Sequence, residues 1–166
     1  ARTPGLLRRL ELGESVALVT DAGTPGLSDP GYYLVKRAIE AGIDVVPIPG
    51  PSALTAALSS SGLPTDRFAF EGFLPVKSGR RQRRLEALSR ETRTVVLFES
   101  PHRITKLLSE LEERMAGRQV VIARELTKIH EEFLRGTVRE VAEQIGRRKA
   151  RGEYVVLIAP DKDGGD

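Results

Sequence analysis

The hydrophobic positions along the first part of the chain follow the alternation of strands and helices that an α/β fold requires. The pattern predicts three helices: one from Thr3-Pro4 to Gly13, one over Tyr32–Ala41 and one over Ala53–Ser61. Two short apolar runs, Ser15–Thr20 and Asp44–Ile48, predict buried strands of a parallel sheet. Strand, loop and helix thus recur in the order of βαβ units.

The remainder of the chain is richer in strands. Apolar runs predict strands at Phe68–Leu74, Thr94–Glu99, Gln119–Ala123 and Tyr154–Ala159, with helices over Pro101–Met115 and Val138–Arg148. The turn-forming segment Gly62–Asp66 predicts a boundary. We therefore expect one α/β domain over residues 1–66, a second over 67–160, and a disordered tail over 161–166.

Composition excludes several classes of site. The 166 residues contain no Cys, which removes disulfides, thiolate nucleophiles and Cys-based metal sites. Two His residues argue against a multi-histidine metal centre, so we expect no metal. No apolar run approaches the roughly 18 residues of a membrane span, and no signal peptide opens the chain. These features predict a cytoplasmic protein without a membrane partner.

Charge adds one further observation, because the chain carries 20 Arg but only 6 Lys. Arginine presents a planar fork that suits phosphate, so this bias is compatible with a nucleic-acid partner. A GC-rich genome explains the same bias equally well. Composition alone does not decide between the two.

The loop at residues 21–31 (DAGTPGLSDPG) follows the first predicted strand, where open α/β sheets bind ligands. Gly23 allows close approach of a ligand, and Asp21 and Asp29 can accept hydrogen bonds from ribose hydroxyls or amines. The alternative is a structural loop whose Asp residues cap turns. The turn Pro49–Ala53 (PGPSA) follows the next strand in the same way, and Ser52 there is expected to cap a helix whose free N–H groups face a ligand.

Basic and polar clusters mark the second half. Lys77–Arg84 (KSGRRQRR) contains five cations and predicts either a solvated segment or an arm that contacts phosphates. The alternation of the upstream Phe residues, Phe68, Phe70 and Phe73, predicts the core face of a strand. Two polar groups, Glu99–Arg103 and Arg124–Lys128, each follow a buried strand, where charges are costly unless paired or used.

Five phrases of the sequence together carry a resemblance to a known family. They are TDAGTPGLSDPGYYLV, VVPIPGPSALTAALSSSGLPTDRFAFEGFLP, LFESPHRI, VIARELTKIHEEFLRGT and RGEYVVLI. The chain resembles the bacterial 16S rRNA (cytidine-2′-O-)-methyltransferases of the tetrapyrrole methylase superfamily from about Thr3 to Pro160. The family's opening strand, its Pro/Gly-rich loop and the next helix and strand have no counterpart here, so we expect a first domain that lacks its N-terminal part.

The resemblance implies a class III S-adenosylmethionine-dependent methyltransferase of two α/β domains that binds its cofactor between them. It implies methylation of a ribose 2′-hydroxyl of a cytidine in 16S rRNA, within the decoding region of the small ribosomal subunit, by a homodimer. Two alternatives remain open at this point. One is a tetrapyrrole, precorrin or diphthine-type methylase of the same superfamily. The other is a non-catalytic fragment that binds RNA or dimerises.

The resemblance also implies roles for individual residues. The predicted S-adenosylmethionine contacts are Asp21, Gly23, Thr24, Ser52, Ala53, Phe98, Glu125, Leu126, Gly152 and Tyr154. The predicted RNA contacts are Lys77, Arg80, Arg81, Arg83, Arg84, Arg103 and Arg124. Because a ribose hydroxyl is a poor nucleophile, we expect a base, either Glu99 or Lys128 with a lowered pKa.

Overall fold

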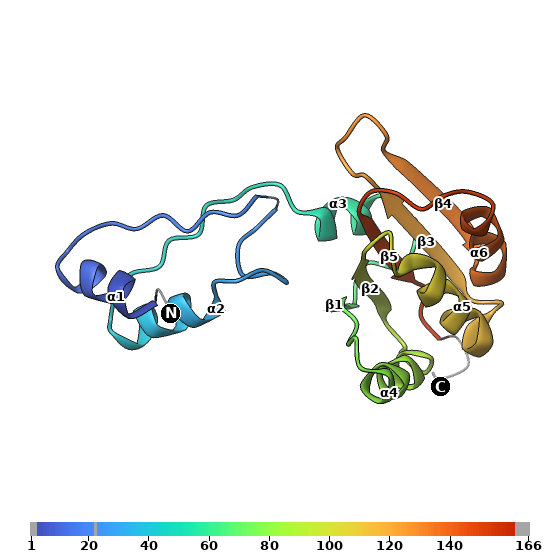
Figure 1. The fold of residues 1–166 in the computed structure, drawn as a ribbon, viewed down its shortest axis with the longest axis horizontal. Helices are drawn as coiled ribbons and strands as arrows, with labels where there is room; N and C mark the ends of the chain where they lie inside the picture. The colour runs from blue at the N-terminus through green and yellow to red at the C-terminus, as the bar shows by residue number, and fades with distance from the viewer. Residues whose placement is uncertain (1–2, 22, 162–166) are drawn as a thin grey trace. The chain divides into compact units, whose positions relative to one another are not determined.

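The computed structural model describes residues 3–21 and 23–161 of the chain (Figure 1). Backbone contacts divide it into two compact units, Ala1–Ser52 and Ala53–Asp166. The division falls before the third helix, whereas the predicted domain boundary lies at residue 66. The predicted domains themselves stay a prediction.

The first unit contains two helices, α1 (Thr3–Glu11) and α2 (Tyr32–Glu40), which pack against each other. Both helices were expected from the apolar spacing and are confirmed. Gly42 follows α2 with a φ of +70°, a conformation that favours glycine and ends the helix.

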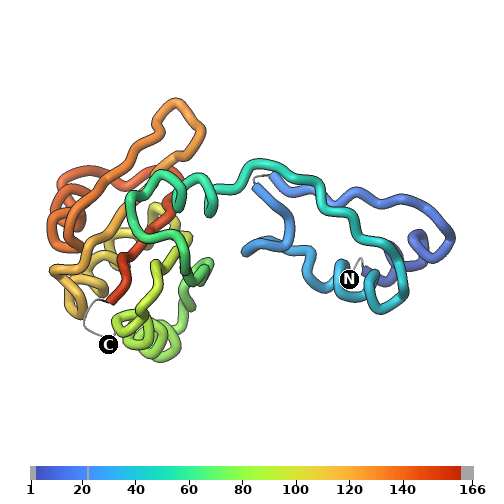
Figure 2. The backbone as a smooth tube through the Cα atoms, turned by 180° about the vertical axis from the view of Figure 1, so that it is seen from behind, coloured from blue at the N-terminus to red at the C-terminus, as the bar shows by residue number. Residues whose placement is uncertain are grey.

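The two strands expected in this unit are wrong. Among the described residues, 15–20 and 44–48 belong to no sheet, although both run as extended backbone (Figure 2). A strand needs a neighbour for its N–H and C=O groups, and neither segment pairs with one. Their apolar side chains are correspondingly open to solvent, with Val19 82%, Val46 74% and Ile48 81% exposed.

The second unit is built on one mixed sheet of five strands in the order β1-β2-β5-β3-β4. The strands are β1 (Phe68–Phe73), β2 (Thr94–Glu99), β3 (Gln119–Arg124), β4 (Glu132–Thr137) and β5 (Tyr154–Ile158). Only β1 and β2 are parallel neighbours; the other pairs are antiparallel. The predicted strands of this half are confirmed.

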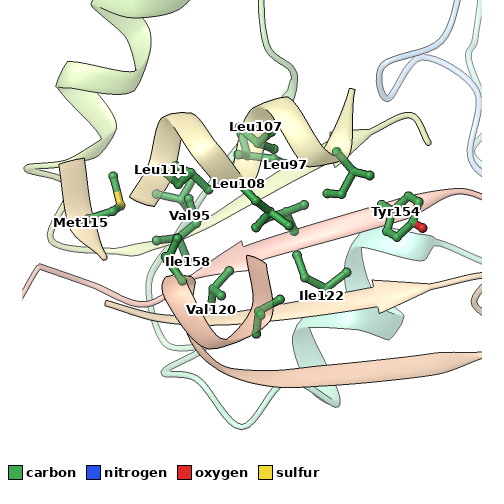
Figure 3. Close-up of a cluster of buried hydrophobic side chains, with 14 of the residues drawn as sticks. Val95, Leu97, Leu107, Leu108, Leu111, Met115, Val120, Ile122, Tyr154 and Ile158 are labelled. Carbon is green, nitrogen blue, oxygen red and sulfur yellow. The ribbon is translucent and has the colours of Figure 1, made fainter. Parts of the chain in front are cut away.

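Four helices accompany this sheet: α3 (Ala53–Ser59), α4 (Ser78–Leu88), α5 (Ile104–Met115) and α6 (Val138–Gly146). Alternate strand residues enter two separate apolar clusters, as the pleat requires. Val95 and Leu97 pack with α4, α5 and α6 on one face, where Leu107, Leu108 and Leu111 lie over the sheet (Figure 3). Val96 packs on the opposite face with Leu54 and other α3 residues.

Two local details differ from expectation. Helix α5 begins at Ile104 rather than Pro101, after a turn in which the Ser100 carbonyl accepts from the N–H groups of Arg103 and Ile104. The β1–β2 register shifts between Phe70 and Gly72, where Gly72 has a φ of +62°. This bulge breaks the alternation of the strand.

The end of the chain is described up to Asp161. Its N–H donates to the Glu91 carbonyl across 2.8 Å, and its carboxylate pairs with Arg118 at 2.5 Å. Residues 162–166 of the predicted disordered tail lie outside the described residues. Across 3–21 and 23–161, no helix combines the length and the apolar character needed to cross a membrane.

Candidate functional site

The polar clusters that follow β2 and β3 lie at one edge of the sheet. Glu99, the last residue of β2, is opposite Tyr154 of β5, and Arg124, the last residue of β3, is opposite Tyr154 on its other side. Because β5 runs antiparallel to both neighbours, its first residue meets their carboxyl ends. Residues far apart in sequence therefore meet at this edge.

Glu99 is buried in a network of charges. Its side chain is inaccessible, its Oε1 accepts from the Ser100 N–H at 2.9 Å, and Arg103 Nε lies 3.3 Å from the same oxygen. Glu99 Oε2 lies 3.6 Å from Arg81 Nη1, without a hydrogen bond. Burial between two guanidinium groups gives Glu99 a structural role and leaves it no path to a substrate in this structure.

Arg81, which was predicted to contact RNA, is buried. Only 3% of the residue is exposed, and its Nε donates to Glu110 Oε2 of α5 across 2.7 Å. Helical spacing explains the burial, because Arg81 shares the inner face of α4 with Leu85 and Leu88. Its guanidinium holds α4 against α5 and β2 and is not open to a phosphate.

Arg103 connects the same network to the loop after β1. Besides its ion pair with Glu99, Arg103 Nη2 donates to the Leu74 carbonyl across 2.8 Å. Its side chain is 28% exposed. Arg103 therefore fixes the backbone of that loop, with part of the guanidinium at the surface.

The loop after β3 contains two strained residues. Glu125 and Thr127 have φ values of +50° and +63°, which L residues adopt rarely. The Glu125 N–H donates to the Glu153 carbonyl at 3.0 Å, and Glu125 Oε1 accepts from the Glu153 N–H at 3.0 Å. These two bonds join the β3 loop to the turn before β5. Strain of this kind is common at ligand sites.

Lys128 closes this arrangement with two carboxylates. Its Nζ lies 2.8 Å from Glu153 Oε2 and 3.0 Å from Glu125 Oε1. The hydrogen bond to Glu153, followed by the one to Glu125, raises the pKa of Lys128 above its ordinary value. The expected lowering is therefore wrong, because carboxylates rather than cations surround the ammonium group. A lysine protonated in this way does not act as a base near neutral pH.

Gly152 is the residue that lets Glu125 reach this position. It has a φ of +83°, and a Cβ built on it would lie 2.4 Å from Glu125 Cγ. Beside this contact is a hollow of about 240 Å³ lined by Arg124, Glu125, His130, Arg151 and Gly152. A Cβ at this predicted cofactor position would therefore clash with the Glu125 side chain, in a backbone conformation that favours glycine.

The remaining predicted residues of the second unit are distributed around this edge. Phe98 and Leu126 pack against the apolar cluster of the α3 face. Tyr154 is buried, and its hydroxyl accepts from the Arg151 N–H at 3.2 Å. Arg124 pairs with Glu132 at 3.2 Å, so this predicted RNA contact already has a carboxylate partner. Ala53 is the exposed first residue of α3.

In the first unit, the two predicted ligand loops contact each other. Thr24 Oγ1 donates to the Pro51 carbonyl at 3.5 Å, and a Cβ on Gly23 would lie 3.9 Å from the same oxygen. Asp29 accepts from Thr20 Oγ1 at 2.9 Å, whereas Asp21 is exposed. The structure thus brings Gly23 and Thr24 next to the turn that contains Ser52.

Helix α4 displays most of the predicted basic arm. Lys77, Arg80 and Arg83 are exposed, and in the part of the chain that the structure describes no carboxylate pairs with them. Arg84 pairs with Glu71 of β1, and that hydrogen bond raises the pKa of Arg84. A groove of about 480 Å³ adjoins Arg80, Arg83 and Arg84.

Some residues at these hollows were not predicted from the sequence. His130 and Arg151 line the smaller hollow. Phe73 lines the groove and is 53% exposed, so the expectation that Phe68, Phe70 and Phe73 mark a core face is wrong for Phe73 and for Phe68, which is 40% exposed. The sequence contained a sign of this difference. Phe70 and Phe73 are three residues apart, whereas residues on one face of a regular strand are separated by two.

Comparison with known proteins identifies relatives. The model of the family described as Tetrapyrrole (Corrin/Porphyrin) Methylases matches residues 3–142. The chain is 50% identical over 159 residues to ribosomal RNA small subunit methyltransferase I of Synechocystis, covering 95% of this chain and 57% of the relative. It is 46% identical to the protein of that name from Thermotoga maritima, covering 95% of this chain and 71% of the relative.

Solved structures share the fold. The methyltransferase CobJ superimposes with a TM-score of 0.71 at 22% identity, covering 96% of this chain and 70% of that one. A second solved structure is uroporphyrin-III C-methyl transferase from Thermus thermophilus complexed with S-adenyl homocysteine. It superimposes with a TM-score of 0.60 at 22% identity, covering 93% of this chain and 70% of that one. These likenesses confirm the predicted α/β fold class. The chain spans a little over half the length of several curated relatives, with 57% and 54% of two of them covered.

Proposed function

The chain belongs to the tetrapyrrole (corrin/porphyrin) methylase family, and from this we propose that it is part of an S-adenosylmethionine-dependent methyltransferase that modifies RNA of the small ribosomal subunit. The observation that carries the proposal is the identity of 45–52% to curated proteins named ribosomal RNA small subunit methyltransferase I, over 92–97% of this chain. The methyltransferase CobJ and the cobalt precorrin-4 methyltransferase CbiF share the fold at only 22% and 20% identity.

The finer proposal follows from the family resemblance of the sequence. The methyl acceptor is a ribose 2′-hydroxyl of a cytidine in 16S rRNA, and the working form is a cytoplasmic homodimer. Methylation of a hydroxyl that is not acidic demands close positioning, because well-oriented groups gain several orders of magnitude in rate.

The predicted cofactor residues fit the chemistry of S-adenosylmethionine. The exposed Asp21 carboxylate offers acceptors for ribose hydroxyls or an ammonium group. Gly23, with a φ of +77°, leaves room for close approach, and the half-buried Phe98 and Leu126 offer an apolar surface. When bound, the cofactor supplies a methyl group that its sulfonium makes electrophilic.

The surroundings of Glu99 and Lys128 do not favour the role of a base, which the sequence suggested for one of them. Glu99 orients Arg103 and Arg81 from a buried position, and Lys128 carries a positive charge held by Glu125 and Glu153. We assign both as positioning residues and no longer as bases. Glu99→Gln and Lys128→Ala should lower methyl transfer without removing the pH dependence of kcat. If either variant abolishes that dependence, it is the base.

The proposed RNA contacts are the exposed cations of α4 and its approach, Lys77, Arg80 and Arg83. Arg84, Arg103 and Arg124 contribute a part of their guanidinium beside their carboxylate partners. Arg81 is left out because it is buried.

Two measurements test the proposal. Calorimetry with S-adenosylmethionine should give a binding heat for the full-length gene product, and Gly152→Ala should weaken it. Radiolabelled methyl should pass from the cofactor into small ribosomal subunits and not into precorrins. Transfer into a tetrapyrrole instead, or no transfer into RNA despite cofactor binding, would refute the proposed substrate.

A further inference from the structure

The lining of the groove between the end of β1 and α4 contains none of the residues expected to bind the cofactor, although its Phe73 packs against one of them, Phe98. Its volume of about 480 Å³ falls within the roughly 300–1,000 Å³ usual for ligand sites. Phe73, Leu74 and Pro75 form an apolar part of its lining, and Arg80, Arg83 and Arg84 form a basic part. The lining therefore suits a ligand that is flat and apolar on one side and anionic on the other.

The cations of the groove differ from most other arginines of this unit. Arg90, Arg139 and Arg147 are exposed and each pairs with a carboxylate on the surface. Arg80 and Arg83 have no such partner among the described residues. The one carboxylate in the lining, Glu71, is neutralised by Arg84. Two unpaired guanidinium groups thus remain for an external anion.

The aromatic ring of the groove is held in place and yet open to solvent. Phe73 is 53% exposed, and its ring centroid lies 5.8 Å from that of Phe98 in an edge arrangement. The ring centroid of Phe98 also lies 5.0 Å from that of Phe70. The bulge at Gly72 produces this cluster: Phe73 lies three residues after Phe70 on β1, but its partner Phe98 lies only two residues after Val96, the partner of Phe70.

The loop that follows Phe73 is fixed as well. Arg103 donates to the Leu74 carbonyl across 2.8 Å, and Arg103 is itself paired with the buried Glu99. Arg81 secures α4 by its bond to Glu110. Both sides of the groove are therefore anchored to the core by buried charges, so a bound ligand would not have to order them.

From these contacts we infer that the groove binds an unpaired nucleotide of single-stranded RNA, with the base stacked on Phe73 and the adjoining phosphates held by Arg80 and Arg83. An anchored aromatic beside unpaired cations is the usual combination for single-stranded nucleic acid. The inference rests on the proposed function for the source of the RNA. The inference adds a specific site for one base to the exposed cations that were already proposed to contact RNA.

The test is fluorescence anisotropy with a short, fluorescein-labelled oligocytidylate. Phe73→Leu should weaken binding by about 5- to 150-fold, the loss expected for one base stack. Phe73→Tyr keeps the ring and should retain most of the affinity. Phe68→Leu is the matched control, because Phe68 is an exposed residue of the same strand outside the groove. It should bind like wild type.

The cations are tested by the salt dependence of binding. Replacing Arg80 and Arg83 by Ala should reduce the slope of log K against log salt by about 1.4, since each contact on a single strand contributes about 0.7. The double replacement of Arg139 and Arg147, which removes equal charge from α6 and its C-cap, should change the slope by less than half of that. A base-paired RNA of the same length should bind more weakly than the oligocytidylate.

Three outcomes would overturn the inference: no binding of the oligocytidylate by wild type, wild-type affinity in Phe73→Leu, or equal losses in Phe73→Leu and Phe68→Leu. Calorimetry with S-adenosylmethionine separates this from the proposed function. If wild type binds S-adenosylmethionine and transfers methyl groups, but Phe73→Leu binds the oligocytidylate like wild type, the RNA site in the groove is rejected and the proposed function stands. Absence of cofactor heat and methyl transfer rejects the proposed function, whatever the oligonucleotide does.

Discussion

Arg81 and Glu110 form an ion pair in the interior of the second unit, with Nε and Oε2 2.7 Å apart and side chains only 3% and 8% exposed. Charges in such a position are costly to desolvate and are tolerated when they are paired. The pair joins α4 to α5, and Arg81 also lies 3.6 Å from Glu99 at the end of β2. One buried arginine therefore fixes the helix that presents the exposed cations.

Replacing Arg81 by Met should destabilise the protein by about 3–5 kcal/mol, because Glu110 is left buried without its main partner. Urea unfolding measures this loss. Arg80→Met is the control on the neighbouring exposed residue and should change stability by no more than about 0.5 kcal/mol. Equal stability of the two variants would show that Arg81 is not buried in solution.

Gly152→Ala should destabilise the protein because the new Cβ meets Glu125 and because the backbone has a positive φ. The cost should exceed about 1 kcal/mol, as expected where Ala cannot adopt the native conformation. Gly146→Ala is a control for which we expect a change of stability in the opposite direction. Gly146 ends α6 with open space around it, so Ala should stabilise by up to about 1 kcal/mol. A neutral Gly152→Ala would contradict the steric account.

The Glu125 carboxyl should titrate below its ordinary value of about 4.3. The N–H of Glu153 lowers its pKa most, and Lys128 adds to the effect. A pKa lowered by folding contributes stability above the unfolded value, and this contribution disappears as pH falls through the folded value. Carboxyl carbon NMR measures the titration directly.

Lys128→Met should raise the pKa of Glu125, because one hydrogen-bond donor is lost. Lys106→Met removes the same charge from an exposed position of α5 and should leave the Glu125 pKa in place. Identical titration curves for wild type and Lys128→Met would mean that Lys128 does not contact Glu125.

Arg103→Ala should loosen the loop at Leu74 and weaken oligocytidylate binding several-fold while the heat of S-adenosylmethionine binding stays the same. The reason is the loss of the bond to the Leu74 carbonyl, not of a cofactor contact. Arg103→Lys keeps the charge but not the two-pronged geometry, so it should restore only part of the affinity. Full restoration by Lys would indicate a purely electrostatic role.

Much of the second unit could be predicted from the sequence. The apolar runs at Thr94–Glu99 and Tyr154–Ala159 are buried on both sides, and such runs predict central strands. The polar clusters at the strand ends were also visible, because Glu99 ends the run Thr94–Glu99 and Arg124 directly follows the run Gln119–Ala123. What periodicity could not give was the direction of each strand, and hence the mixed sheet.

Other features were missed, some because they depend on contacts between distant segments and one because a local spacing was not used. The segments 15–20 and 44–48 are apolar enough for strands but have no paired neighbour among the described residues. The basic run at Lys77–Arg84 looked uniformly exposed, yet Arg81 lies on the inner face of its helix. The spacing to Leu85 and Leu88 contained that information. The pKa of Lys128 was predicted in the wrong direction because Glu153 is distant in sequence.

The most direct test of the central claim is nucleoside mass spectrometry of 16S rRNA from cells with and without the gene. Loss of the gene should remove one 2′-O-methylcytidine from 16S rRNA, and the full-length gene should restore it. Restoration should fail with a gene that carries Gly152→Ala. An unchanged content of 2′-O-methylcytidine after deletion would contradict the proposal that this chain belongs to a ribose methyltransferase of small-subunit RNA.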